Sequence, residues 1–223
     1  MSGKLYIVAT PIGNLSDISL RALETLKKVD AIACEDTRVT SKLLARYEIR
    51  KELISYHQHS KESKVSQVIK FLKDGENIAL VSDAGTPGIS DPGNQLIGLV
   101  QAQEIEVEII PGPSALAAAL SACHFSVQEF VFYGFLPQKK GRQTKLIAIG
   151  QELRTVVLYE SVYRIKKLLN EIVEYRGDSE ICVCRELSKI HETIYRGRVS
   201  EVAPLITEKG EFVVIIKGEH GKK

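Results

Sequence analysis

Short apolar runs alternate with helix-like stretches through the N-terminal half of the sequence, and this alternation limits the folds open to the chain. The runs cover residues 5–9, 31–34, 78–81 and 107–110, and each ends abruptly in polar or turn-forming residues. Between them, apolar residues recur at helical spacing; they are Ile18, Leu20, Leu23, Leu26 and Val29, and then Val65, Val68, Ile69 and Leu72. Runs that are apolar throughout are typical of strands covered on both faces. We therefore expect an α/β layer with a largely parallel sheet.

The second half of the sequence is richer in strand-like segments. The strand candidates are residues 130–135, 155–159, 180–184, 193–196 and 212–217, with only three helical patterns among them. Two of these candidates follow one another after a short break, which indicates an antiparallel pair and a mixed sheet. The pattern changes after an alanine-rich stretch, so we expect a hinge near residues 111–121. We predict two α/β domains, one over residues 1–116 and one over residues 117–223.

The amino-acid composition restricts the possible binding partners more than it restricts the fold. Of the 223 residues 44% are hydrophobic, enough for a substantial core, and 30 basic against 28 acidic residues give a net charge of +2. A polyanion would have to be held by local basic clusters. Neither a signal peptide nor an apolar run of bilayer length occurs, so we expect a cytoplasmic protein with no membrane segment. The closest cysteines, Cys182 and Cys184, are predicted to share one buried strand face rather than to bind a metal.

Glycine and proline gather in three loops that follow predicted strands. These loops comprise residues 10–14, 83–90 and 111–114. The second lies within LVSDAGTPGISDPGNQL, where we expect Asp91 to be the N-cap of the next helix and Pro92 to lie in its first turn. Ser114 is the expected N-cap after the third loop. Each loop alone could be merely a tight turn, but three stiff loops at strand ends predict a ligand-binding crevice.

Common nucleotide-binding and nucleophile motifs are absent from the sequence. No G-x-G-x-x-G follows the first strand, and neither G-x-x-x-x-G-K-[ST] nor G-x-S-x-G occurs. A Rossmann cradle, a P-loop and a nucleophile elbow are therefore not supported. Loops lined by backbone suit a ligand of modest charge that needs flat, closely fitting walls.

Seven stretches, taken in order, carry a family resemblance. They are LYIVATPIGNLSDISLRALETLKKVDAIACEDTR, LVSDAGTPGISDPG, IPGPSALAAALSA, FYGFLPQKKGR, LYESVYRI, CRELSKIHETI and GEFVVIIKG. Together they resemble the ribosomal RNA small subunit methyltransferase I family, which belongs to the class III, tetrapyrrole-methylase-like, S-adenosylmethionine-dependent enzymes. The resemblance implies a homodimer of two-domain subunits with the cofactor in the cleft between the domains.

The resemblance also implies a reaction, the 2′-O-methylation of a cytidine in the decoding region of 16S rRNA, a substrate carried by the small ribosomal subunit. Longer relatives continue into a further helical segment after the stretch similar to GEFVVIIKG. We therefore expect RNA binding here to depend on the remaining surface or on the dimer partner.

Matching the family motifs residue by residue implies a set of cofactor contacts. From the N-terminal loops these are Pro11, Ile12, Asp83, Gly85, Thr86, Ile89, Ser114 and Ala115, and from the C-terminal domain Tyr159, Cys184 and Phe212. Tyr159 and Phe212 could equally be ordinary core residues.

Methyl transfer to a ribose hydroxyl benefits from a side chain that accepts the proton late in the reaction. The candidates are Asp36, Glu160, Glu186 and either His57 or His59. Each has a plainer alternative, because Asp36 could pair with Arg38, Glu160 could cap the next helix, and the histidines could be solvated surface.

A short basic run follows FLP in the second half and has the composition of a phosphate-contacting loop. It contains Lys139, Lys140 and Arg142, and Arg38, Arg185 and Lys189 lie at other strand ends that could face the same ligand. Replacing Lys139, Lys140 and Arg142 by alanine is expected to weaken RNA binding without altering cofactor affinity.

Two other functions compete with rRNA methylation. One is methylation of a small molecule such as a tetrapyrrole. The TPIGN sequence of the first loop argues against it, since tetrapyrrole enzymes usually carry a glycine-richer loop there. The other is a noncatalytic module that binds RNA or a coenzyme.

Overall fold

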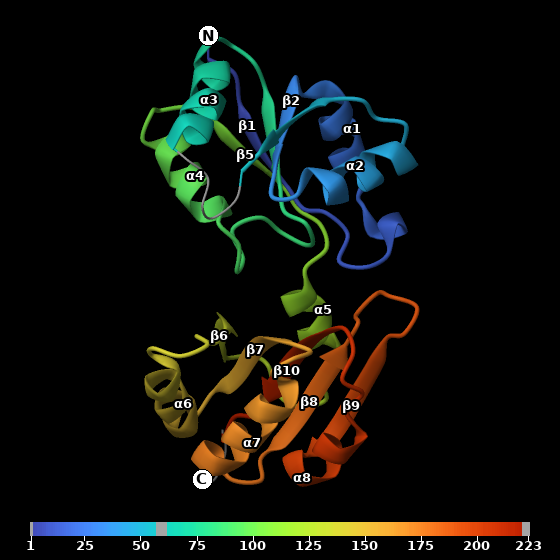
Figure 1. Ribbon diagram of the computed structural model, residues 1–223, viewed down its shortest axis with the longest axis vertical. Coiled ribbons are helices and arrows are strands. Elements are labelled where there is room, and N and C mark those ends of the chain that lie inside the picture. The colour runs from blue at the N-terminus through green and yellow to red at the C-terminus, as the bar shows by residue number, and fades with distance from the viewer. Residues whose placement is uncertain (1, 57–61, 220–223) are drawn as a thin grey trace. The chain divides into compact units, whose positions relative to one another are not determined.

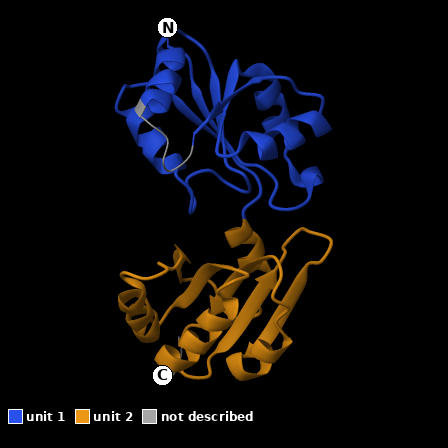
Figure 2. Cartoon of the chain, viewed as in Figure 1, with its two compact units in different colours: residues 1–114 blue, residues 115–223 orange. Residues whose placement is uncertain are grey.

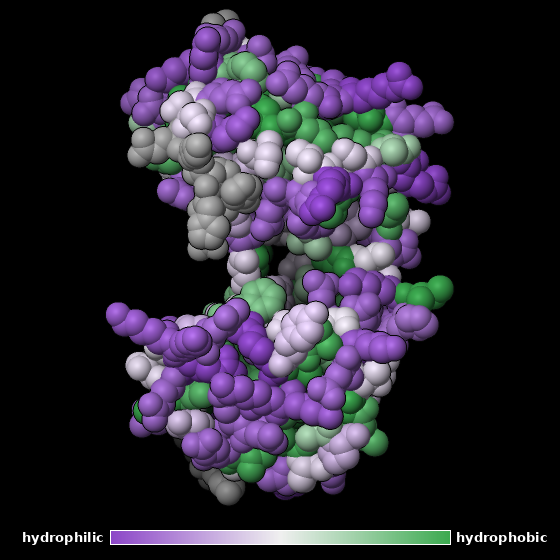
Figure 3. Space-filling model, viewed as in Figure 1, coloured by the Kyte–Doolittle hydropathy of each residue, from purple (hydrophilic) through white to green (hydrophobic). Residues whose placement is uncertain are grey.

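The computed structural model describes residues 2–56 and 62–219. The chain divides into two compact units, Met1–Ser114 (unit 1) and Ala115–Lys223 (unit 2), which Figure 2 distinguishes by colour. Each unit is built on its own five-stranded sheet. On the face of unit 2 shown in Figure 3, hydrophilic side chains predominate and apolar ones are scattered among them.

Unit 1 contains an entirely parallel sheet. Its strands are β1 (Leu5–Val8), β2 (Ala31–Cys34), β3 (Glu52–Ser55), β4 (Ile78–Val81) and β5 (Val107–Ile110). Their spatial order is β3-β2-β4-β1-β5, and every adjacent pair is parallel. The central strands β2 and β4 are buried at every position. This confirms the parallel sheet expected from the uniformly apolar runs.

Helices cover both faces of this sheet, as Figure 1 shows. They are α1 (Leu20–Lys28), α2 (Thr37–Arg46), α3 (Glu62–Lys73) and α4 (Gly93–Gln101), with a short turn η1 (Leu15–Asp17) before α1. Leu26 of α1 and Leu43 of α2 share one core cluster with Val8 and Ile32 of the sheet. Leu72 of α3 and Leu96 of α4 belong to a separate cluster. The chain thus leaves the adjacent strands β1 and β4 toward opposite faces, which is the arrangement that creates a ligand crevice in open α/β sheets.

Unit 2 contains a mixed sheet. Its strands are β6 (Phe130–Phe135), β7 (Thr155–Ser161), β8 (Glu180–Arg185), β9 (Thr193–Arg198) and β10 (Glu211–Ile216), in the order β6-β7-β10-β8-β9. The β6–β7 pair is parallel and the other pairs are antiparallel. The carboxyl ends of β6, β7 and β8 therefore lie at the same sheet edge as the starts of β9 and β10. The predicted mixed sheet is confirmed.

Two hydrophobic clusters cover the two faces of the second sheet. The larger one packs α6 (Arg142–Gln151), α7 (Ile165–Arg176) and α8 (Val199–Val202) against one face, and the turn η2 (Ala203–Leu205) follows α8. The smaller one packs α5 (Ala115–Ala122) against the other face, where Cys182 and Cys184 are buried with their Sγ atoms 4.0 Å apart. Their predicted shared, buried face is thereby confirmed.

Two elements of unit 1, β3 and α2, were not predicted, and one helix start was misplaced. The sheet edge formed by β3 is only partly buried, so it lacks the uniformly apolar signature. Helix α4 begins at Gly93 with Pro92 as its N-cap, one residue later than expected. The Oδ1 atom of Asp91 accepts hydrogen bonds from the N–H groups of Gly88 (2.8 Å) and Gly93 (2.7 Å), so this side chain joins the loop to the helix. No helix in the described part of the chain is long and apolar enough to cross a membrane.

Candidate functional site

The first two loops of unit 1 are joined where β1 and β4 end. Thr10 and Gly85 form an isolated antiparallel bridge, in which Thr10 N donates to Gly85 O (2.9 Å) and Gly85 N donates to Thr10 O (3.0 Å). The buried hydroxyl of Thr10 also donates to the carbonyl of Ser82 at 3.0 Å. These bonds fix the two loops to one another rather than leaving them as independent turns.

The third loop is attached to the second by a side chain. The Thr86 hydroxyl donates to the carbonyl of Pro113 at 3.1 Å. Gly85 has a φ of +85°, and a Cβ there would lie 3.5 Å from Ile12 Cγ2 and 3.8 Å from Pro113 O. The structure therefore brings Ile12, Gly85 and Thr86 together at one sheet edge, with Ser114 directly after Pro113.

The distal part of the second loop is equally constrained. Gly88 has a φ of +89°, and a Cβ on it would lie 2.5 Å from Asn94 Oδ1. The Asn94 side-chain amide donates to the Gly88 carbonyl at 2.7 Å. Between these anchors the apolar side chain of Ile89 is 37% exposed. An apolar side chain held at the surface by a rigid loop can form one wall of a ligand site.

Carboxylates gather beside these loops. Asp83 Oδ1 accepts a hydrogen bond from the backbone N–H of Asp36 at 2.9 Å. Burial raises the pKa of Asp83, and burial together with the charges of Asp83, Asp91 and Asp36 raises the pKa of Glu35. Burial is the larger cause of both raised pKa values and the neighbouring negative charges add to it, and a bound cation would offset both effects. The donor set therefore fits a ligand that carries positive charge.

The Asp36 carboxylate is occupied by its own helix and by Arg38. It accepts the Arg38 backbone N–H at 2.8 Å as the cap of α2, and it also binds the Arg38 guanidinium, with Oδ2 at 2.6 Å from Nη2. The side-chain hydrogen bonds from Arg38, followed by its backbone hydrogen bond, lower the pKa of Asp36 to about 2. The pairing alternative is thus present in the structure, and such a low pKa makes Asp36 a weak proton acceptor.

This pairing has a measurable consequence. Replacing Arg38 by alanine is expected to raise the pKa of Asp36 from about 2 toward its usual 3.8, as a titration of the carboxyl carbon by NMR would show. The folded-state pKa is depressed, so the pairing stabilises the fold above about pH 4 and ceases to do so as the pH falls toward 2. Glu152, whose pKa Arg154 likewise lowers to about 2, is the internal control and must not change. An unaltered Asp36 titration would contradict the assigned cause.

In unit 2, Tyr159 and Cys184 lie on one face of the sheet and Phe212 lies on the other. Tyr159 and Cys184 are both paired with Val213 across β10, and all three pack in the cluster on the α5 side. Phe212 is 2% exposed and belongs to the cluster on the α6–α8 side. Alternation along β10 turns the Phe212 side chain into the core, the ordinary core role that the sequence also allowed, and places Val213 on the face shared by Tyr159 and Cys184.

Tyr159 is positioned by aromatic neighbours. Its ring meets Phe132 and Phe135 edge to face, with centroids 4.9 and 5.5 Å apart. Burial raises the pKa of Tyr159, an effect that a hydrogen bond to the Leu116 backbone partly offsets. The ring is thus fixed against α5 at the end of β7.

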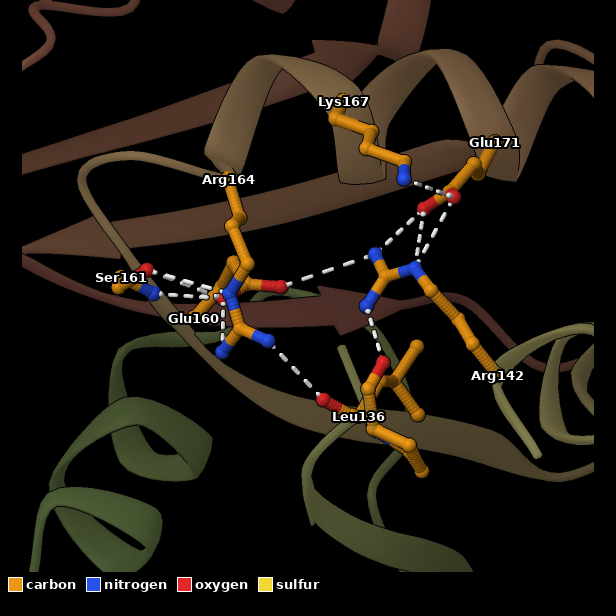
Figure 4. A network of polar contacts seen from close by, with 8 residues as sticks. Leu136, Arg142, Glu160, Ser161, Arg164, Lys167 and Glu171 are labelled. Carbon is orange, nitrogen blue, oxygen red and sulfur yellow. Dashed lines mark hydrogen bonds and ion pairs between the residues drawn. The ribbon is translucent and has the colours of Figure 1, made fainter. Parts of the chain in front are cut away.

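A network of buried charges lies on the opposite side of β7 (Figure 4). The Arg142 guanidinium binds Glu171 through two nitrogens, with Nε 3.0 Å from Oε1 and Nη2 2.5 Å from Oε2. Arg164 Nη2 lies 2.8 Å from Oε1 of Glu160, which also accepts the Ser161 N–H at 2.8 Å. The other oxygen of Glu160 lies 3.8 Å from Arg142 Nη2 and accepts no hydrogen bond from the described residues.

This network corrects two sequence-based assignments. Glu160 is only 1% exposed, so it holds Arg164 instead of presenting a carboxylate to a ligand. Arg142 is 5% exposed and pairs with Glu171, so it is not available to a phosphate. Gly141, with a φ of +83°, precedes α6, and Arg142 at the first position of that helix is buried. The expected triple alanine variant would therefore mix a surface effect with the loss of a core contact.

The other basic residues that the sequence suggested as RNA contacts lie in different environments. Lys139 and Lys140 are exposed. The Arg38 side chain is 86% exposed but bound to Asp36. Arg185 is buried and donates to the carbonyls of Lys209 (2.6 Å) and His191 (3.1 Å), so it joins two loops rather than facing a ligand. The prediction that Arg185 contacts RNA is therefore wrong for the structure described.

Glu186 and Lys189 form a pair at the end of β8. Lys189 Nζ lies 2.8 Å from Glu186 Oε1 and 2.8 Å from Glu211 Oε2. Burial opposes ionisation of Glu186, but Lys189 and the Glu211 backbone N–H outweigh it and lower the pKa of Glu186. The predicted candidates His57 and His59 lie outside the described residues.

Sequence reasoning missed several residues at these edges. Glu35 directly precedes Asp36 in the same quoted motif, and only its burial in the fold, which raises its pKa, distinguishes it from Asp36. Val213 follows Phe212, and only the strand register assigns it to the sheet face that packs against α5. Arg164 lies four residues after Glu160, a spacing that indicates an ion pair on a helix but is less informative in the turn found here.

The fold, together with the loops at the carboxyl ends of the strands, defines a class of protein. The family model for tetrapyrrole (corrin/porphyrin) methylases matches residues 4–203, across both units. The chain belongs to this tetrapyrrole methylase family.

Within that family, named relatives are similar over nearly the whole chain. The ribosomal RNA small subunit methyltransferase I of Thermotoga maritima is 44% identical over 97% of this chain and 99% of its own length. The protein of the same name from Bacillus subtilis is 46% identical over 99% of this chain and 77% of its own length. The family resemblance predicted from the seven motifs is thereby confirmed.

Solved structures agree on the fold. A cobalt precorrin-4 methyltransferase has a TM-score of 0.72 at 19% identity, over 96% of this chain and 94% of its own. A uroporphyrin-III C-methyltransferase from Thermus thermophilus, complexed with S-adenosyl homocysteine, has a TM-score of 0.69 at 18% identity, over 96% and 97%. The predicted two-domain α/β fold of the tetrapyrrole methylase type is confirmed.

Proposed function

We propose that this protein is an S-adenosylmethionine-dependent rRNA methyltransferase that modifies the 2′-hydroxyl of a cytidine in the decoding region of 16S rRNA. The observation that carries the proposal is 44% identity, over almost the full length of both chains, to a ribosomal RNA small subunit methyltransferase I. The substrate would be met in the small ribosomal subunit in the cytoplasm, and the active form would be a homodimer.

The loops of unit 1 fit the proposed cofactor. S-adenosylmethionine would supply a methyl group activated by the positive charge of its sulfonium. The carboxylates of Asp83, Glu35 and Asp91 favour a cation at this edge, and the bridge between Thr10 and Gly85 keeps the loops in place. We propose contacts from Pro11, Ile12, Asp83, Gly85, Thr86, Ile89 and Ser114, and from Ala115, Tyr159 and Cys184 of unit 2.

The proton of the ribose hydroxyl needs an acceptor. Asp36 and Glu186 remain candidates, because both lie at the carboxyl ends of strands and neither is fully buried. Their lowered pKa values weaken them as bases. Glu35 is the stronger candidate of the three because burial and its acidic neighbours raise its pKa. Replacing each by its amide should therefore reduce turnover most at Glu35.

A methyl-transfer assay tests the proposed function. Radiolabelled S-adenosylmethionine is incubated with the protein and with undermethylated small ribosomal subunits, naked 16S rRNA or uroporphyrinogen. Label is expected in the rRNA of the subunits, in a dinucleotide that resists alkaline hydrolysis because its 2′-oxygen is blocked. Label in uroporphyrinogen would instead identify a small-molecule methylase. Cofactor binding by calorimetry without any transfer would identify a noncatalytic module.

A further inference from the structure

A tight turn after β7 exposes an aromatic side chain. Residues 161–164 form this turn, in which Arg164 N donates to Ser161 O at 3.1 Å. Tyr163 lies in the turn and is 94% exposed, whereas its neighbours Val162 and Arg164 are partly buried. Val162 packs against the core of unit 2, and Arg164 joins the buried charge network. The turn is therefore anchored on both sides of a ring that contacts almost nothing.

The same arginine anchors the neighbouring basic loop. Arg164 Nη1 donates to the Leu136 carbonyl at 3.1 Å, and Arg142 Nη1 donates to the next carbonyl, that of Pro137, also at 3.1 Å (Figure 4). These carbonyls immediately precede Gln138, Lys139 and Lys140. Since β6 and β7 are adjacent parallel strands, their carboxyl ends present the lysines and Tyr163 at one edge of the sheet.

The exposed groups at this edge are suited to a nucleic acid. Lys139 and Lys140 are exposed, and neither has a carboxylate partner among the residues the structure describes. Unpaired ammonium groups attract phosphates, and an exposed aromatic ring at the same sheet edge offers a stacking surface to a base. A paired base lies within its helix stack and cannot reach such a ring, so the arrangement favours single-stranded over duplex RNA.

We propose that Lys139, Lys140 and Tyr163, here called the Tyr163 platform, bind a single-stranded segment of RNA, with phosphates at the lysines and an unpaired base on the Tyr163 ring. The buried charges of Glu160, Arg164, Arg142 and Glu171 position the platform without contacting RNA. This inference rests on the proposed rRNA substrate and adds to it the strandedness of the segment and the side chain that stacks.

Three variants and one matched control test the platform. Their binding is measured to a short fluorescent single-stranded RNA and to the same strand annealed to its complement. Y163A is expected to weaken single-strand binding by about fivefold to one hundredfold, the range for loss of one stacked base, with the salt dependence unchanged. Y163F keeps the ring and is expected to bind nearly as the native protein does. K139A/K140A is expected to reduce the slope of log affinity against log salt by about 0.7 per lysine. Binding to the duplex is expected to be weak throughout.

The matched control is K27A/K28A, another exposed pair of adjacent lysines, which ends α1 at the amino edge of the unit 1 sheet. It is expected to bind RNA as the native protein does. Cofactor calorimetry and circular dichroism should be unaltered in Y163A, which shows that the variant is folded. If Y163A binds single strands normally, the platform is refuted, and the same holds if Y163A lowers the oligomeric state in sedimentation without weakening RNA binding.

The two proposals fail in different ways. If the native protein methylates small-subunit rRNA but Y163A retains full RNA affinity, the platform is wrong and the proposed function stands. If the native protein transfers no methyl group to rRNA, the proposed function is wrong, whatever the RNA affinity of the variants.

Discussion

Replacing Arg142 by methionine is expected to destabilise unit 2 by about 3–5 kcal/mol, the usual cost of removing one partner from a buried ion pair. The guanidinium makes a two-nitrogen contact with Glu171, lies 3.8 Å from Glu160 and donates to the Pro137 carbonyl. Methionine has a similar volume but satisfies none of these groups, so Glu171 keeps only Lys167, 3.8 Å away, and Glu160 keeps only Arg164. Urea unfolding followed by circular dichroism measures the change.

The pair of Arg154 and Glu152, in which only the arginine is exposed, provides the control for this measurement. Arg154 also binds its carboxylate through two nitrogens, at 2.8 Å each, but its side chain is half exposed. R154A is therefore expected to cost less than about 1 kcal/mol. A double variant, R142M/E171L, removes both charges of the buried pair and is expected to recover part of the loss. A cost for R142M as small as that for R154A would show that water screens the network.

Replacing Gly85 by valine is expected to reduce S-adenosylmethionine affinity by about tenfold to one hundredfold, on the proposed function. A Cβ at Gly85 already reaches contact distance from Ile12 and Pro113, and the two further methyl groups of valine would enter the space where the three loops meet. Overpacking of this kind costs about 1–3 kcal/mol, and the φ of +85° adds strain for any residue with a side chain. Isothermal titration calorimetry with the cofactor measures the effect.

Gly141 separates the strain from the steric effect. It has a similar φ of +83°, but no atom lies within 4 Å of the position that a Cβ would take. G141V is therefore expected to lose less stability than G85V, because it carries the strain without the overpacking, and to bind the cofactor normally. Equal cofactor affinity in the two variants would mean that Gly85 does not border the ligand.

The sequence allowed the loops of unit 1 to be predicted because their chemistry is local. Gly85, Gly88 and the prolines require particular backbone angles wherever they occur, and the apolar runs before them indicate where the strands end. The bridge between Thr10 and Gly85 could not be predicted, since it depends on β1 and β4 becoming neighbours across 75 residues. The strand β3 was missed because an edge strand lacks the uniformly apolar pattern.

Side-chain direction limited the predictions for unit 2. Lys139, Lys140 and Arg142 form a single basic run in the sequence, but α6 begins at Arg142, and its partner Glu171 lies 29 residues away. Phe212 was included among the cofactor contacts by motif matching, which does not show toward which face of a strand buried on both sides a side chain turns. In both cases tertiary contacts, rather than residue type, determine which side chain is available.

The bridge between Thr10 and Gly85 has a consequence for the thermodynamics of binding. A flexible loop loses conformational entropy when a ligand orders it. Here backbone hydrogen bonds join the two loops directly, with no ligand atom between them, so much of that ordering is completed during folding. The amides of Thr10 and Gly85 should accordingly exchange with deuterium as slowly as those of a strand, before any ligand is added.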